Sequence, residues 1–167
     1  MTYRRIIVPV TLATDSLEGA AAAAELAARL DAELILAGVA PLVPSGPLAD
    51  WASVGETPQR QVEEQQLLDR ILTERLAEVG DALTDGVRWR SVISWGPVGP
   101  ALVEAARDER ADLIVVPIRR EPELAHLVHD HADRYVLHHS DVPVLVVPTN
   151  GARHGTDARA DGAGGLG

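Results

Sequence analysis

Two runs of apolar residues near the end of the chain, 113–116 and 142–147, predict two strands, and the segment between them has helical spacing. Neither run alternates with polar residues, which is typical of strands buried on both faces of a parallel sheet. The segment 117–141 is long enough for a loop and a crossover helix. Ligands of such sheets bind beyond the carboxyl ends of the strands. A functional site is therefore expected directly after Val116.

The rest of the chain continues the same alternation of strand and helix. Further strands are predicted at 5–10, 33–39 and 87–94, the last at a sheet edge because one of its faces is more polar. Helices are predicted at 15–30, 59–79, 100–109 and from Asp130 as cap to about His139. The order predicts an α/β fold with a doubly wound five-stranded parallel sheet.

The core positions of the first two helices follow from the same spacing. We expect small residues at the contacts between helix and sheet, because much of the apolar content is alanine and the chain has no Phe. The predicted stripes are Leu17, Ala20, Ala21, Ala24, Ala27 and Ala28 in the first helix, and Leu68, Ile71, Leu72, Leu76 and Val79 in the second.

Composition and charge narrow the classes of function. The formal charge of −10 opposes binding to nucleic acid or to an anionic membrane, and the absence of cysteine excludes disulfides and thiolate metal sites. The apolar run after Arg5 is too short for a signal peptide or a membrane span. We expect a cytoplasmic protein with one domain at 1–148 and a disordered tail at 149–167 that is rich in Gly, Ala and Asp.

Four segments in order resemble the universal stress protein family across about residues 3–148. They are Ile6–Val10, the turn and helix start Trp95–Leu102, Ala111–Val116 and Ser140–Val147. The resemblance implies a Rossmann-like fold of the adenine nucleotide alpha hydrolase type, with strand order 3-2-1-4-5, and a stress-response role.

The ATP-binding motif of that family is absent. ATP-binding members carry Gly-x-x-Gly-x9-Gly-(Ser/Thr) between the last two strands and an Asp after the first strand, and these positions correspond here to Pro117, Arg120, Asp130, His131 and Thr11. Proline has no N–H to offer a phosphate, and a carboxylate at the cap of the following helix repels one. We predict that the chain does not bind ATP in the family manner.

The corresponding cleft remains the candidate ligand site. Two alternatives stay open: a nucleotide switch or slow ATPase with an altered phosphate loop, and an anion site built on Arg119 and Arg120. Pairing of these arginines with Glu121, Glu123 or Asp130 is favoured over anion binding. The candidate cleft residues are Pro9, Val10, Thr11, Val39, Pro117, Arg119, Arg120, Asp130 and His131.

Neither a metal site nor a catalytic group is predicted. His126 with Asp130 and His129 with Asp133 have a spacing of four residues that suits metal ligands on a helix, but surface histidines on a polar face are the preferred interpretation. No serine has the context of a nucleophile and no carboxylate pair is placed for acid-base chemistry. The sequence favours a non-enzymatic regulatory module without a cofactor.

The last strand predicts the mode of assembly. It lies at the sheet edge in the order 3-2-1-4-5 and carries no charge from Val142 to Val147, so it needs a cover against uncontrolled pairing. A second copy paired antiparallel about a two-fold axis supplies that cover. We predict a homodimer through Val144, Leu145, Val146 and Val147.

Overall fold

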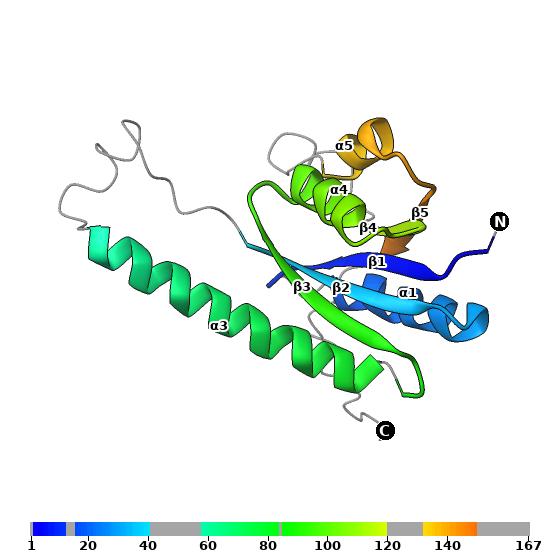
Figure 1. The fold of residues 1–167 in the computed structure, drawn as a ribbon, viewed down its shortest axis with the longest axis horizontal. Helices are drawn as coiled ribbons and strands as arrows, with labels where there is room; N and C mark the ends of the chain where they lie inside the picture. The colour runs from blue at the N-terminus through cyan, green and yellow to red at the C-terminus, as the bar shows by residue number, and fades with distance from the viewer. Residues whose placement is uncertain (1, 13–15, 41–57, 84, 120–131, 150–167) are drawn as a thin grey trace, which may run out of the picture.

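A five-stranded sheet forms the centre of the molecule in the computed structural model, which describes residues 2–12, 16–40, 58–83, 85–119 and 132–149 (Figure 1). All pairings are parallel and the order is β3-β2-β1-β4-β5, which confirms the predicted fold. The strands are β1 (Arg5–Val10), β2 (Glu33–Ala40), β3 (Trp89–Trp95), β4 (Leu113–Arg119) and β5 (Val144–Thr149).

The helices cover both faces of this sheet. On one face lie α1 (Ser16–Leu30) and α3 (Pro58–Leu83), and on the other lie α4 (Val98–Asp108) and α5 (Ala132–His139), as Figure 1 shows. Each face has its own apolar core, one centred on α1 and α3 and the other on α4. Because β1 and β2 are covered on both sides, nearly all of their side chains are buried. None of the described helices is long and apolar enough to cross a membrane.

Small residues bring the helices close to the sheet, as expected. Ala20, Ala23 and Ala27 of α1 are fully buried, whereas Ala21 and Ala28, which were predicted for the same stripe, are exposed. Gly38 of β2 lies directly under α3, where an added Cβ would stand 2.7 Å from the Leu76 side chain. The buried stripe of α1 is therefore rotated relative to the predicted one and includes Ala23, because alanines occur on both sides of the helix.

The long helix α3 is buried only over part of its length. Leu72, Leu76 and Val79 pack into the core, but the predicted core residue Ile71 is 40% exposed. Leu67, at 53%, is also exposed. The first turns of α3 extend past the sheet in Figure 1 and have no strand beneath them. The apolar spacing of α3 thus continues beyond the part of the helix that the sheet can cover.

Several boundaries differ from the prediction. The strand β4 continues to Arg119, so Pro117 is a strand residue and not the first residue of a loop. The strand β5 ends at Thr149, which the sequence had assigned to the tail. Helix α4 begins at Val98 after Pro97 as the N-cap, so Pro100 is not its first residue. The remainder of the predicted tail, residues 150–167, lies outside the described residues.

Candidate functional site

The carboxyl ends of β1, β2 and β4 bring together the described part of the predicted cleft. Pro9 and Val10 are the last residues of β1 and are buried, and Thr11 follows them half-buried. Val39 is buried near the end of the neighbouring β2. Pro117 is half-buried on β4. These five residues therefore lie at one edge of the sheet, as a site at the switch point between β1 and β4 requires.

The seam between β1 and β4 ends where two prolines face each other. The pairing of these strands comprises Ile6 with Leu113 and Ile7 with Ile114, although both strands continue. The N–H of Ile114 donates to the carbonyl of Pro143, next to β5, so the even-numbered residues of β4 face β5. Backbone groups alternate along a parallel strand, and those of Pro117 therefore face β1. The carbonyl of Arg4 accepts a hydrogen bond from the N–H of Glu33 on β2, so the even-numbered residues of β1 face β2. The odd-numbered residues, Pro9 among them, therefore face β4.

As a consequence, the carboxyl end of this seam lacks the two N–H groups that residues 9 and 117 would otherwise supply. Proline lacks the N–H that would continue the ladder, and here both strands present a proline to the same seam. A phosphate placed between the ends of β1 and β4 would find no N–H on Pro9 or Pro117. The two residues thus separate the strands without forming the amide-lined nest that phosphate binding uses.

Helix α1 packs directly against this position. Gly19 lies against the ring of Pro117, and a Cβ at Gly19 would stand 2.8 Å from the Pro117 Cβ and 3.0 Å from its Cγ. Real Cβ atoms do not approach other atoms that closely, so the contact requires glycine. Close packing of Gly19 on Pro117 fills the space beside the end of β4 with protein atoms. The sequence alone showed both residues but not that they touch.

Some predicted site residues are not placed by the structure. Arg120, His126, His129, Asp130 and His131 lie outside the described residues, and only the backbone of Arg119, at the end of β4, is described. Asp133 lies in the first turn of α5. Among the described residues no cluster of His, Asp and Glu could hold a metal ion.

Thr149 is a residue of this edge that the sequence prediction missed. It pairs in register with Arg119, its side chain is fully buried, and its Oγ1 has no hydrogen-bond partner within the described structure. A buried hydroxyl without a partner is unusual. The apolar run before Thr149 was the available signal, because a strand two residues longer places Thr149 beside β4 and away from solvent.

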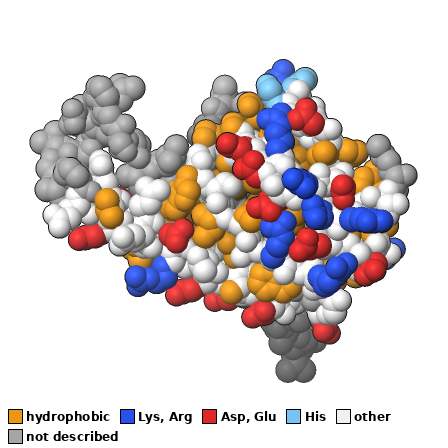
Figure 2. All heavy atoms as spheres, in the orientation of Figure 1, with side chains coloured by type: hydrophobic (Ala, Val, Ile, Leu, Met, Phe, Trp, Pro, Cys, Tyr) orange, Lys and Arg blue, Asp and Glu red, His pale blue; other side chains and the backbone are white. Residues whose placement is uncertain are grey.

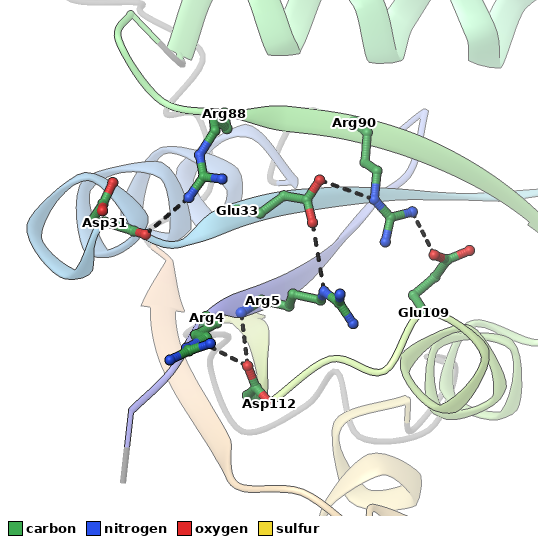
Figure 3. A network of polar contacts seen from close by, with 8 residues as sticks. All are labelled: Arg4, Arg5, Asp31, Glu33, Arg88, Arg90, Glu109 and Asp112. Carbon is green, nitrogen blue, oxygen red and sulfur yellow. Dashed lines mark hydrogen bonds and ion pairs between the residues drawn. The ribbon is translucent and has the colours of Figure 1, made fainter.

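The amino ends of the same strands carry a network of charges (Figure 3). The carboxylate of Glu33 on β2 lies 3.8 Å from Arg5 on β1 and 3.3 Å from Arg90 on β3, and Arg90 also pairs with Glu109 at the end of α4. Three strands and one helix are linked in this way. The cations are all arginines, since the chain contains no lysine. A guanidinium has enough donors to serve two carboxylates at once.

A second carboxylate at this edge binds backbone groups. Oδ2 of Asp112, just before β4, accepts the N–H groups of Arg4 at 2.8 Å and Arg5 at 2.9 Å. The start of β1 is thereby attached to the start of β4. In Figure 2 arginine and carboxylate side chains gather on the right of the view, over the amino ends of the strands seen in Figure 1. Within the described residues, this charge network therefore lies at the edge opposite to the predicted cleft.

Comparison with known proteins agrees with this architecture. The sequence pattern of the Universal stress protein family matches residues 2–148. No curated protein sequence matches. Among solved structures, the universal stress protein UspA from Lactobacillus plantarum is 22% identical with a TM-score of 0.63, and the match covers 88% of this chain and 99% of that one.

Two further structures of the same fold were determined with nucleotides. A universal stress protein in complex with cAMP is 25% identical with a TM-score of 0.55, and the match covers 89% of this chain and 99% of that one. The universal stress protein from Archaeoglobus fulgidus in complex with dAMP is 19% identical with a TM-score of 0.51 over 87% of this chain and 98% of that one.

The parallel sheet of order 3-2-1-4-5 with helices on both faces defines a Rossmann-like α/β protein with its switch point between β1 and β4. The family pattern extends over almost the whole of that domain. The chain belongs to the universal stress protein family.

Proposed function

We propose that this chain is a non-enzymatic stress-response module that does not bind ATP in the manner of the ATP-binding members of its family. The observation that supports this most directly is the pair of prolines at the end of the β1–β4 seam, with Pro117 packed on Gly19. A glycine at position 117 would supply a flexible N–H at this point, whereas proline supplies a ring and no donor.

Thermal unfolding with and without nucleotide tests the proposal. ATP at millimolar concentration is expected to leave the melting temperature within error of the value without ligand. A ligand present at about 100 times its Kd adds roughly 2.7 kcal/mol to the free energy of unfolding, so a site with a Kd of tens of micromolar would raise the melting temperature clearly. A rise of several degrees with ATP would refute the proposal.

The alternative function is a nucleotide switch with an altered site. It is favoured by the complexes of structurally similar universal stress proteins with cAMP and dAMP. Neither ligand has a γ-phosphate, so the absence of the glycine motif should weaken their binding less than it weakens the binding of ATP. Calorimetric titration with cAMP and AMP beside ATP separates the two functions: binding of a monophosphate alone supports an altered switch, and binding of none supports the first proposal.

A third possibility is an anion site on Arg119 and Arg120. Arg119 is the last residue of β4 and lies in register with Thr149, whose buried Oγ1 has no partner within the described structure. Inorganic phosphate in the same thermal assay tests it, because a site built on these arginines requires no nucleoside. Replacement of both arginines by glutamine should then abolish any stabilisation by phosphate.

The proposed module acts as a homodimer through β5. Within the described residues β5 pairs with β4 on one side only. Leu145 is 41% exposed, and Val144, Val146 and Val147 are half-buried. The bond from the Ile114 N–H to the Pro143 carbonyl sets the alternation of β5, so the N–H groups of Val144 and Val146 point away from β4. These two donors are available to a second copy.

The alternation of N–H groups along β5 identifies a mutation that affects this interface alone. Val146→Pro removes an N–H that points away from β4 and leaves the β4–β5 ladder intact. Proline at Leu145 would instead remove an N–H that points toward β4 and would break that ladder. We expect a dimer for the parent chain and a monomer for Val146→Pro in sedimentation equilibrium at tens of micromolar. The variant Val146→Ala retains the N–H and serves as the control, with a dimer expected. A monomeric parent would contradict the interface.

A further inference from the structure

A cavity of about 220 Å³ lies at the amino edge of the sheet, between the carboxyl end of α4, the start of β4 and the turn before β5. It is separate from the cleft at the carboxyl ends of the strands. Its floor is apolar: Val103 and Ala106 of α4, Ala111, Ile114 of β4 and Val142. All of these except Val142 are at least 94% buried. Such a floor accepts a small hydrocarbon or aromatic group and offers it no polar partner.

The rim of the cavity carries two guanidinium groups. Arg107 is held in place, because its Nε donates to the Asp141 carboxylate at 2.7 Å and its Nη2 donates to the His139 carbonyl at 3.3 Å. A guanidinium has five N–H donors, so three of those on Arg107 remain. No described residue accepts a hydrogen bond from the Arg110 side chain, and all of its donors are left for a ligand.

The backbone at Arg110 has a conformation in which glycine is the usual residue. Arg110 has a φ of 53°, in the left-handed region where glycine is favoured. The N–H of Ala111 bonds to the Ala106 carbonyl at 2.8 Å and that of Arg110 to the Arg107 carbonyl at 3.1 Å. These two bonds form a Schellman motif, whose left-handed position is usually glycine. Arginine at this position, where glycine would strain the backbone less, places a cation on the rim.

The opposite side of the rim is a fixed turn. The Ser140 hydroxyl donates to the Val142 carbonyl at 2.7 Å and accepts from the Val142 N–H at 3.1 Å. The serine is therefore occupied within the turn and does not act as a nucleophile. Asp141 contributes a negative charge that Arg107 compensates. The remaining charge of the rim is the positive charge of Arg110, in a chain whose formal charge is −10.

We propose that this cavity binds a small amphipathic carboxylate, with its apolar body on the Ile114 floor and its carboxylate on Arg110 and the free donors of Arg107. Two guanidinium forks match the planar geometry of a carboxylate. The fixed turn and the anchored Arg107 hold the rim in place before a ligand arrives, which lowers the entropy lost on binding. Binding here requires no nucleotide and is independent of the cleft at the other edge.

Methyl NMR of the full chain during titration with sodium benzoate tests the proposal. We expect saturable shifts at the methyl groups of Ile114, Val103 and Val142, with a Kd on the order of 1 mM for so small a ligand. Benzamide has the same ring without the charge, and inorganic phosphate has charge without an apolar body. Both are expected to bind at least tenfold more weakly. Benzamide binding as tightly as benzoate would overturn the proposal.

The variant Arg110→Gly removes the cation and gives the Schellman motif its preferred residue. Its melting temperature should be no lower than that of the parent, so lost binding cannot be ascribed to unfolding. Benzoate affinity should fall at least tenfold, as expected for loss of charge-assisted hydrogen bonds. Arg70→Gln, at an exposed position of α3, makes the same change in net charge and should bind as the parent does. Unchanged affinity in Arg110→Gly, or shifts that do not saturate, would refute the site.

Discussion

At the carboxyl ends of β1 and β4 two prolines face each other and leave two positions of the seam without an N–H, whereas at the amino edge of the sheet ion pairs join β1, β2 and β3. The fold usually binds ligands at the first edge. In this chain Gly19 of α1 packs against Pro117 at that edge, and the amino edge has the charge network and a cavity. A fold indicates where to search for a site, and the groups present there determine which ligands it can bind.

The largest effect is expected from breaking the contact at the carboxyl edge. Gly19→Val should lower the free energy of unfolding by about 3 kcal/mol, because its side chain overlaps the Pro117 ring. Chemical denaturation measures the loss. Ala21→Val on the exposed side of the same helix serves as the control and should cost only about 0.5 kcal/mol of helix propensity.

A double mutant shows whether Pro117 is the cause of that loss. Pro117→Gly removes the ring, so Gly19→Val in the Pro117→Gly background should cost about 1 to 3 kcal/mol less than in the parent. Additive effects would mean that Gly19 is required for another reason. The same double mutant opens the seam, which makes it the variant in which any gain of ATP affinity should first be sought.

A smaller effect is expected at the amino edge from Asp112→Ala. The substitution leaves the N–H groups of Arg4 and Arg5 without their acceptor, which should lower the free energy of unfolding by about 2 kcal/mol at roughly 1 kcal/mol for each bond. Asp112→Asn retains an acceptor oxygen and should lose less than half as much. Equal losses in both variants would show that the charge of Asp112, and not its acceptor geometry, holds the start of β1.

The smallest effect is expected from Glu33→Gln. The Glu33 side chain is 30% exposed, so each of its ion pairs should contribute no more than about 1 kcal/mol and less at high salt. Denaturation at low and high salt should show the difference from the parent shrinking. Glu25→Gln, which breaks the exposed pair with Arg29 on α1, gives the baseline for a surface pair. A Glu33→Gln loss no larger than this baseline would mean that the network acts as separate pairs.

The sheet could be predicted from the sequence because each buried strand carries a continuous apolar run, as in Ile6–Val10 and Leu113–Val116. These patterns are local, so they can be recognised without knowledge of the partner strand. The strand order came with the family resemblance. Where several alanines follow one another, as in α1, the pattern no longer distinguishes one face from another. That is why Ala21 and Ala28 were placed in the core.

The site could be predicted only in part because its properties depend on register. Pro9 and Pro117 were both recognised, but that they face each other depends on which backbone groups point across the seam. Gly19 was not recognised, since nothing in a helical segment shows which residue meets a proline nearly a hundred positions later. Arg110 likewise appears as an ordinary charged residue until its φ of 53° is known. Contacts between distant segments are set by packing, which local patterns do not contain.

The position of β1 between β2 and β4 has a consequence for the synthesis of the chain on the ribosome. Asp112, whose carboxylate binds the N–H of Arg5, follows it by 107 residues. At typical elongation rates of about 5 to 20 residues per second, β1 waits roughly 5 to 20 seconds for its neighbour on that side. During this time the nascent chain exposes an apolar strand with one unpaired edge, so chaperone binding should concentrate on intermediates from which β4 has not yet emerged.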